Sequence, residues 1–181
     1  MRGGLFSAPE LGTPVLESFG PPPDRFLPKE IVSAWESGNP HYPKRDSSTP
    51  AQKAGLAYQK WVVKFVESGD CSSFKVRPGI WYCYHDGECR RYCQPDILLQ
   101  DDSSKTLVIV EVKLRWTADA WWQVQRLYTP VLRRVFGPDW TLIPLVIAKS
   151  YDPAVRIVES VKLCDDVFDV SPSLFNVMVV R

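Results

Sequence analysis

The spacing of apolar and polar residues predicts a first helix that begins at Thr49. The segment Thr49-Pro50-Ala51-Gln52 combines an N-capping threonine, a proline at the first helical position and a glutamine three residues after the cap. Ser68-Gly69 supplies the stop. Small and apolar residues recur at helical spacing on the inward stripe, which consists of Gly55, Val62 and Val66.

Two pairs of strands are expected after this helix. Apolar runs flank Asp86-Gly87, so residues 80–85 and 88–93 are predicted to form a hairpin. If the dipeptide makes a two-residue turn, Tyr84 faces Cys89 across the hairpin. Residues 97–100 and 106–113 are predicted to pair next across a polar loop, and the second of these runs is as rich in Leu, Val and Ile as a central strand.

A second long helix and a buried strand are expected in the next segment. Thr117 is expected to cap a helix from Ala118 to about Phe136, kinked at Pro130. Its inward stripe is Ala120, Val124, Leu127, Val131 and Val135. Residues 141–150 read as a buried strand, in which Pro144 leaves room for an edge position or a bulge. A short helix near 154–163 and a terminal strand at 175–180 complete the expectation.

The N-terminal segment, residues 1–48, is predicted to be a Pro-rich extended arm, followed by one domain at 49–181. Nine of the sixteen prolines lie in the first fifty residues, where each removes a backbone donor and fixes φ. A short amphipathic piece is expected to dock on the body through Leu27, Ile31, Val32 and Trp35. The arm either wraps its own domain or binds a protein partner or a second copy of the chain.

Composition favours a soluble protein of a reducing, cytoplasmic compartment. Five cysteines among 181 residues argue against a disulfide scaffold. No stretch approaches the roughly 18 consecutive apolar residues of a membrane span, and the N-terminus lacks a secretory signal. Because the net charge is only +1, nucleic-acid binding would require a local basic patch.

The chemistry is expected at Asp96, Glu111 and Lys113, which lie on otherwise apolar strands. Alternate residues of a strand share a face, so Glu111 and Lys113 project to one side and Val110 and Val112 to the other. If Gln100 pairs with Thr106, Asp96 falls opposite Val110. Both carboxylates and the lysine are therefore expected in one place.

This set suits the hydrolysis of a phosphodiester with a divalent cation. Mg²⁺ prefers oxygen ligands, and Asp96, Glu111 and the Val112 carbonyl can supply them; Mn²⁺ is expected to substitute. A lysine two residues beyond the second carboxylate can orient or deprotonate the attacking water.

Pro95-Asp96 followed by Glu111-Val112-Lys113 resembles the motif of the PD-(D/E)XK nuclease superfamily. The resemblance covers roughly residues 49–150. It implies an α/β fold of the restriction-endonuclease type, with an α-β-β-β-α-β core in which helices flank a mixed sheet. It also implies metal-dependent cleavage of DNA, with the two carboxylates as metal ligands.

Two further features resemble the RecB-type and lambda-exonuclease-like branch of that superfamily. Members often carry a glycine and, four residues later, a glutamate on the first helix; here Gly55 is followed by Gln59, which is expected to help shape the site. They also carry a glutamine and a tyrosine on the next helix. Helical geometry favours Gln125 with Tyr128 over Gln123, and Arg115 and Arg126 are expected to contact DNA.

Two alternatives stay open. A non-catalytic DNA-binding or assembly protein can retain a nuclease fold, and glutamine in place of glutamate at position 59 supports that hypothesis. A small zinc-dependent binding module is the other, built on Cys83, His85, Cys89 and Cys93, although their spacing contains no CxxC. Exonuclease and endonuclease activity are not distinguished by the sequence.

Overall fold

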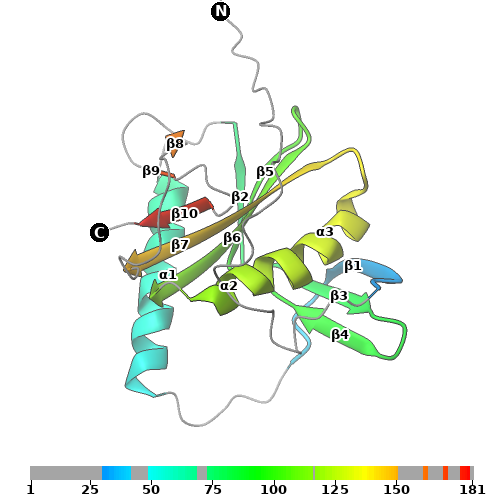
Figure 1. Cartoon of the computed structure of the whole chain (residues 1–181), viewed down its shortest axis with the longest axis horizontal. Helices are drawn as coiled ribbons and strands as arrows, with labels where there is room; N and C mark the ends of the chain where they lie inside the picture. Colours follow the sequence, from blue (N-terminus) through cyan, green and yellow to red (C-terminus); the bar gives the residue numbers. More distant parts are fainter. Residues whose placement is uncertain are drawn as a thin grey trace, which may run out of the picture.

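The computed structural model describes residues 30–41, 49–68, 73–115 and 117–150, and three short strands beyond them (Figure 1). In chain order the elements are β1 (Ser33–Ser37), α1 (Pro50–Ser68), β2 (Lys75–Pro78), β3 (Trp81–His85), β4 (Arg90–Cys93), β5 (Ile97–Asp101), β6 (Thr106–Arg115), α2 (Ala118–Gln123), the π-helix η3 (Val124–Tyr128), α3 (Thr129–Phe136), β7 (Thr141–Ser150), β8 (Val161–Lys162), β9 (Asp169–Val170) and β10 (Asn176–Val179).

The larger sheet has the strand order β2-β5-β6-β7-β10-β9-β8. β5 runs antiparallel to both of its neighbours, β2 and β6, whereas β7 runs parallel to both β6 and β10. The long strand β6 lies between β5 and β7, and its run from Leu107 to Val112 is buried. The apolar composition of this strand follows from its central place, because both of its faces are covered.

Helices cover the two faces of this sheet (Figure 1). Tyr58, Val62 and Val66 of α1 pack on one face, against a set of strand residues that includes Val110 and Val112. The other face is covered by α2, η3 and α3, with Trp121, Trp122 and Leu132 packed against Leu107 and Ile109. The architecture is therefore mixed α/β, as the sequence indicates.

A second, three-stranded sheet has the order β1-β3-β4 and packs against the helical layer that contains α3. Tyr82 and Tyr84 of β3 belong to the same apolar cluster as Trp121 and Trp122. β1 comes from the segment that the sequence assigns to the arm, and it pairs antiparallel with β3. Of the four residues expected to dock, Ile31 packs against the core, Val32 and Trp35 are exposed, and Leu27 lies outside the described residues. The segment docks instead through the pairing of β1, and Arg134 donates to the Val32 carbonyl just before this strand at 2.7 Å.

The capping box at the start of α1 is confirmed. The Thr49 N–H donates to Gln52 Oε1 at 2.9 Å, and the Gln52 N–H donates to Thr49 Oγ1 at 3.2 Å. These reciprocal bonds satisfy two backbone donors that a helix N-terminus otherwise leaves without partners. α1 ends at Ser68, as expected.

Both hairpins are correctly placed, but the first turn is longer than expected and the second is one residue shorter. Tyr84 pairs with Arg91 rather than Cys89, and Thr106 pairs with Asp101 rather than Gln100. An aspartate side chain explains each case: Asp86 accepts the backbone N–H of Cys89 at 3.0 Å, and Asp101 accepts that of Ser103 at 2.9 Å. Such side-chain turns stabilise four-residue loops.

The helix after β6 differs from expectation at its centre. Instead of a simple kink at Pro130, the chain forms the π-turn η3, in which the Thr129 N–H donates to the Val124 carbonyl five residues back. A proline lacks the N–H of a regular helix and its ring clashes with the carbonyl four residues earlier, so a wider turn just before Pro130 relieves the conflict.

The remaining expectations concern the edges of the large sheet. β2 was not predicted; it is a four-residue edge strand that ends in Pro78, which an edge tolerates. β10 confirms the terminal strand, and it pairs with residues 145–148, so Pro144 lies just outside the doubly paired part of β7. Of the helix expected at 154–163, Val161–Lys162 form β8 and residues 154–160 and 163 lie outside the described residues. None of the helices within the described ranges is long and apolar enough to cross a membrane.

Candidate active site

Asp96 precedes β5 and is held by groups from two other elements. Its Oδ1 accepts a hydrogen bond from Gln59 Nε2 of α1 at 2.7 Å, and its Oδ2 accepts one from the Val112 N–H of β6, also at 2.7 Å. The Asp96 carbonyl accepts the Gly79 N–H at 3.0 Å. Gly79 has a φ of +62°, a conformation that disfavours other residues at this turn. Both the backbone and the carboxylate of Asp96 are therefore fixed.

The register of β5 and β6 places Asp96 beside Glu111. Ile97 pairs with Val110, so continuing the antiparallel ladder by one residue brings Asp96 opposite Glu111 instead of the expected Val110. Glu111 is 2% exposed and lies against the layer that contains η3. The strand alternation is as predicted, because Val110 and Val112 pack on the α1 side.

Pro95 leaves the Val112 carbonyl without the backbone donor that a longer ladder would supply. The N–H and C=O of one strand residue point to the same neighbouring strand, and the Val112 N–H points to Asp96. In the continued register Val112 lies opposite Pro95, which has no N–H. The Val112 carbonyl is thus oriented toward the same end of β5 as the Asp96 carboxylate.

Glu111 is only half satisfied by its neighbours. The Lys113 ammonium group contacts Glu111 Oε1, and the lysine side chain is 35% exposed. Glu111 Oε2 is buried and accepts no hydrogen bond of normal geometry, although the Tyr128 hydroxyl lies near enough to lower the pKa of Glu111. A buried carboxylate oxygen without a well-formed hydrogen bond is costly, so this atom marks a position where a cation would be stabilised.

Tyr128 of η3 connects the site to the helical layer. Its hydroxyl donates to the Gln94 carbonyl at 3.1 Å and accepts a hydrogen bond from Gln123 Nε2. The Gln94 side chain in turn donates to the Gly79 carbonyl at 2.7 Å. The expected pairing of Gln125 with Tyr128 is wrong, because the π-turn brings residues five apart, here Gln123 and Tyr128, one above the other.

Burial and mutual repulsion disfavour the charged forms of the two carboxyl groups. The pKa of Glu111 is raised above its ordinary value, chiefly by burial and then by the charge of Asp96, while Lys113 acts against the rise. The pKa of Asp96 is raised by burial, against the opposing effects of the Val112 N–H and Lys113. Burial also raises the pKa of Tyr128, and the charges of Glu111 and Asp96 add to this. A bound cation would stabilise the charged forms of Asp96 and Glu111 and so lower the pKa of both carboxyl groups.

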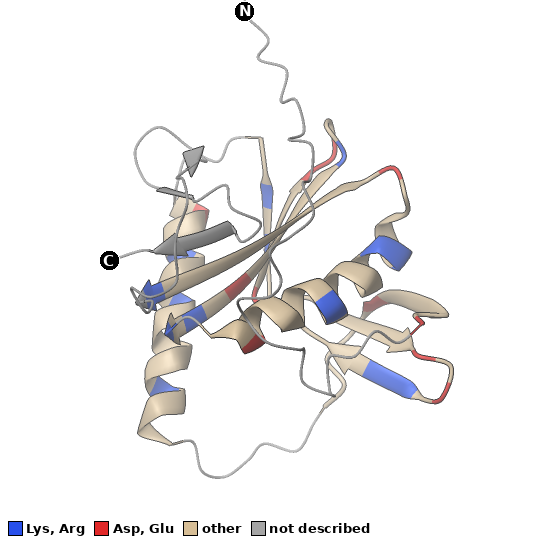
Figure 2. Ribbon diagram, in the orientation of Figure 1, with Lys and Arg blue, Asp and Glu red and all other residues tan. Residues whose placement is uncertain are grey.

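Of the two arginines expected to contact DNA, Arg115 is exposed at the end of a strand and Arg126 packs on an aromatic ring. Lys113, Arg115 and Lys149 lie at the carboxyl ends of β6 and β7, where basic positions gather in Figure 2. Arg126 lies over the ring of Trp122, with 5.6 Å from its guanidinium carbon to the ring centroid. Trp121 is buried in the core.

The three cysteines that the structure describes do not assemble into a metal centre. Cys83 and Cys93 are buried and Cys89 is exposed, and all three are free thiols. Within the described ranges, no group of three or more His, Cys, Asp or Glu side chains could hold a metal ion. The candidate site itself offers two carboxylates, Asp96 and Glu111, with the Val112 carbonyl as a backbone oxygen.

Sequence reasoning missed two residues that build this site, Gly79 and Gln94, and ranked a third, Gln123, below Gln125. Pro78-Gly79 is a recognisable turn signal, although its contact with Asp96 is long-range. Gln94 lies next to Pro95-Asp96, but its part in the site is long-range: its carbonyl accepts from Tyr128 and its side-chain amide donates to the Gly79 carbonyl. Gln123 was considered as the partner of Tyr128 but was set aside, because regular helical geometry favours Gln125 and a π-turn has no reliable sequence pattern.

Comparison with protein-family models, with curated proteins and with solved structures found no match to this chain.

Proposed function

We propose that the chain is a Mg²⁺-dependent nuclease of the PD-(D/E)XK type that hydrolyses phosphodiester bonds of DNA. The observation that carries the proposal is the buried Oε2 of Glu111, which accepts no hydrogen bond of normal geometry and lies adjacent to Asp96 and Lys113. This atom belongs to one of two neighbouring carboxyl groups with raised pKa values. Such a pair favours the binding of a hard divalent cation, because these ions prefer oxygen ligands. Mn²⁺ is expected to substitute for Mg²⁺.

The residues present fit that ion. Asp96 and Glu111 would hold it, with the Val112 carbonyl as a third oxygen. Gln59 donates its amide to Asp96 and is therefore a positioning residue rather than a ligand. When bound, Mg²⁺ would neutralise charge on the phosphate and lower the pKa of the attacking water.

Lys113 is the residue suited to act on the water and the phosphate. Its ammonium group reaches Glu111 Oε1, and its partial exposure leaves it accessible to a substrate. There it can orient the water and stabilise the negative charge that develops as the water oxygen bonds to phosphorus and the bond to the leaving sugar oxygen breaks. Tyr128 and Gln123 brace the buried side of the same site.

The order of elements supports the proposal independently of the motif. Leaving aside the β3–β4 hairpin, the chain from residue 50 to 150 runs α1-β2-β5-β6-α2/α3-β7, which is the α-β-β-β-α-β order that the resemblance implies. Asp96 lies immediately before β5, Glu111 and Lys113 lie on β6, and Gln59 and Tyr128 come from the flanking helices, an arrangement that supports the proposal.

One observation favours a non-catalytic DNA-binding or assembly protein instead. Lys113 already contacts Glu111, and Gln59 already donates to Asp96, so both carboxyl groups have a protein partner without a metal ion. In that case the site would be a structural hydrogen-bond cluster. Calorimetric titration with Mg²⁺ and Mn²⁺ separates the two functions, because only the nuclease needs the ion.

The decisive experiment is Mg²⁺-dependent cleavage of matched linear and covalently closed circular DNA by the purified chain. Asp96→Ala and Lys113→Ala should each lower cleavage by about 10²-fold or more. Asp102→Ala and Lys105→Ala are matched controls, because they change the same residue types in the exposed loop of the same hairpin. Wild-type activity in a correctly folded Asp96 or Lys113 variant would contradict the proposal, and cleavage of the circle would require an endonuclease.

A further inference from the structure

The β3–β4 hairpin of the smaller sheet is inserted between two neighbouring strands of the larger sheet, β2 and β5 (Figure 1). The chain leaves the larger sheet after Pro78 and returns to it at Ile97. Both connections are short, and Asp96 is the last residue of the returning one. The inserted hairpin therefore joins the larger sheet directly beside a residue of the candidate site.

Two hydrogen bonds join the outgoing connection to the returning one. The Gly79 N–H donates to the Asp96 carbonyl at 3.0 Å, and Gln94 Nε2 donates to the Gly79 carbonyl at 2.7 Å. Both polar backbone groups of Gly79 are thus bonded to the segment that carries Asp96. We call these two hydrogen bonds, formed by Gly79, Gln94 and Asp96, the clasp.

The clasp holds Asp96 at a place where the regular sheet does not. The ladder between β5 and β6 begins at Ile97, so Asp96 lies just outside it. Pro95, the residue before it, has no N–H to donate. The bonds that the Asp96 carboxylate accepts orient its side chain, whereas the bond from Gly79 holds the backbone from which that side chain extends. A shift of this backbone would move the carboxylate.

Gly79 and Gln94 fit each other closely. Gly79 has a φ of +62°, and a β-carbon added there would lie 3.3 Å from Gln94 Nε2. The backbone carbonyl of Gln94 accepts the Tyr128 hydroxyl at 3.1 Å. Gln94 is therefore bonded both to the outgoing connection through its side chain and to the helical layer through its backbone.

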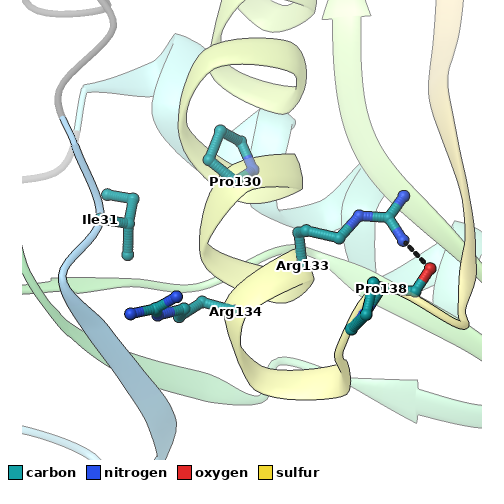
Figure 3. A pocket seen from close by; sticks show the side chains of 5 residues that line it. All are labelled: Ile31, Pro130, Arg133, Arg134 and Pro138. Carbon is teal, nitrogen blue, oxygen red and sulfur yellow. Dashed lines mark hydrogen bonds between the residues drawn. The ribbon is translucent and has the colours of Figure 1, made fainter.

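The rest of the smaller sheet is fixed to the helical layer. Tyr82 and Tyr84 of β3 pack in the apolar core that includes the helices. The segment that carries Ile31, just before β1, runs beside α3, and Arg134 extends from the helix toward it and donates to the Val32 carbonyl (Figure 3). Because these contacts hold the smaller sheet against the helices, the clasp links a fixed body to Asp96.

We propose that Gln94 is a positioning residue of the candidate metal site, and that the clasp makes the Mg²⁺ affinity depend on the smaller sheet. The proposal rests on the proposed function and deepens it, since it names an element that controls the same site. Gln94 bonds to the backbone of Gly79 and acts on the site through Asp96. Removal of a group that supports a metal ligand typically lowers metal affinity by about 10- to 100-fold.

Gln94→Met tests the clasp, because methionine has a similar length but cannot donate a hydrogen bond. The Kd for Mg²⁺, measured by isothermal titration, should rise about tenfold. In the metal-free protein, hydrogen exchange of the Gly79 and Val112 amides should become several-fold faster, because both amides donate to Asp96. Thermal unfolding verifies that the variant is folded.

Two controls separate the clasp from a general loss of stability. Gln100→Met removes another partly buried glutamine, which bonds to Arg77 at the opposite end of β5, and it should change neither the affinity nor the exchange. Gly79→Ala should act like Gln94→Met, because the added β-carbon crowds the Gln94 amide. Gly137→Ala also places alanine at a positive φ, but its β-carbon would meet nothing within 4 Å, so the Mg²⁺ affinity should stay unchanged.

The outcomes distinguish this proposal from the proposed function. If Gln94→Met has the Mg²⁺ affinity and the Val112 exchange rate of Gln100→Met, the role of the clasp is overturned even if the wild type cleaves DNA. Faster exchange at Gly79 alone would also overturn it, because the Asp96 carboxylate would then keep its place without the clasp. If the wild type binds no Mg²⁺, the proposed function fails, whereas faster Val112 exchange in Gln94→Met still supports the positioning of Asp96 by Gln94.

Discussion

Glu111 bears an electrostatic penalty in its charged form, because its carboxyl group is buried beside Asp96. In the metal-free protein the folded state therefore favours the protonated form. When folding raises the pKa of a carboxyl group, the folded protein becomes less stable as the pH rises from the ordinary pKa of 4.5 toward the folded pKa of about 7. The metal-free protein should thus be less stable at pH 8 than at pH 5 as far as this residue is concerned.

Glu111→Gln tests this directly. A neutral amide of the same shape removes the charge, so the metal-free variant should be more stable than the wild type at pH 8, by a few degrees in Tm, and its stability should depend less on pH across the window from about 4.5 to 7. Thermal unfolding in EDTA at several pH values measures both effects. A variant that is less stable than wild type at pH 8 would show that the Lys113 contact outweighs burial.

The residue at position 59 should affect both the charge balance of the metal-free site and its affinity for Mg²⁺. Gln59→Glu would replace an amide donor to Asp96 with a carboxylate, so the two groups would repel each other in the metal-free protein. The same carboxylate adds an oxygen ligand, and Mg²⁺ binding should become roughly tenfold tighter, or about 1.4 kcal/mol. Isothermal titration measures the affinity, and Gln59→Leu, which can neither donate nor ligate, is the comparison; unchanged affinity in the glutamate variant would place residue 59 away from the ion.

At the scale of elements, the π-turn η3 decides which glutamine reaches Tyr128. Gln123→Ala should lower kcat about five- to tenfold with little change in KM, because one hydrogen bond worth about 1 kcal/mol is lost at a side chain that braces the site. Gln125→Ala should remain within about twofold of wild type. Steady-state kinetics of the two variants measure the difference, and a larger loss in Gln125→Ala would support a regular helix over the π-turn.

Local rules account for the elements that the sequence predicted well. The capping box at Thr49 and Gln52 and the alternation around Val110, Glu111 and Val112 depend on neighbours within a few residues. The same rules placed both hairpins but not their registers, because Asp86 and Asp101 stabilise four-residue loops through side-chain bonds, in place of the two-residue and five-residue loops expected. A shift of one residue moved Asp96 from Val110 to Glu111, which brought the two carboxylates closer than expected.

Features that depend on distant parts of the chain were not predictable in this way. β2 is too short and too charged to show a strand pattern, and it forms because β5 offers a free edge. β1 is set by its pairing with β3 and by the contact between Arg134 and the Val32 carbonyl, which are far apart in sequence. The contact of Gln59 with Asp96 was expected in kind, because a polar side chain on an apolar stripe needs a partner.

At the scale of the whole molecule, the candidate site joins the layers on either side of the large sheet. Gln59 comes from α1, Asp96 and Glu111 from the sheet, and Tyr128 from the helical layer on the opposite face. An ion held by Asp96 and Glu111 would therefore stabilise contacts between all three layers. Since it would bind the folded state and not the unfolded chain, its effect should appear in global unfolding.

Mg²⁺ at about 100 times its Kd should stabilise the protein by about 2.7 kcal/mol, which corresponds to roughly 5–10 °C in Tm for a chain of this size. The shift should shrink as pH falls below about 7, because protons then compete with the ion for Glu111. Differential scanning calorimetry with Mg²⁺ and with EDTA measures it, and Asp96→Ala serves as the control that should show no shift. An equal Mg²⁺ shift in that variant would place the ion elsewhere, whereas a wild-type shift that disappears with Asp96 ties the stability of all three layers to the site between them.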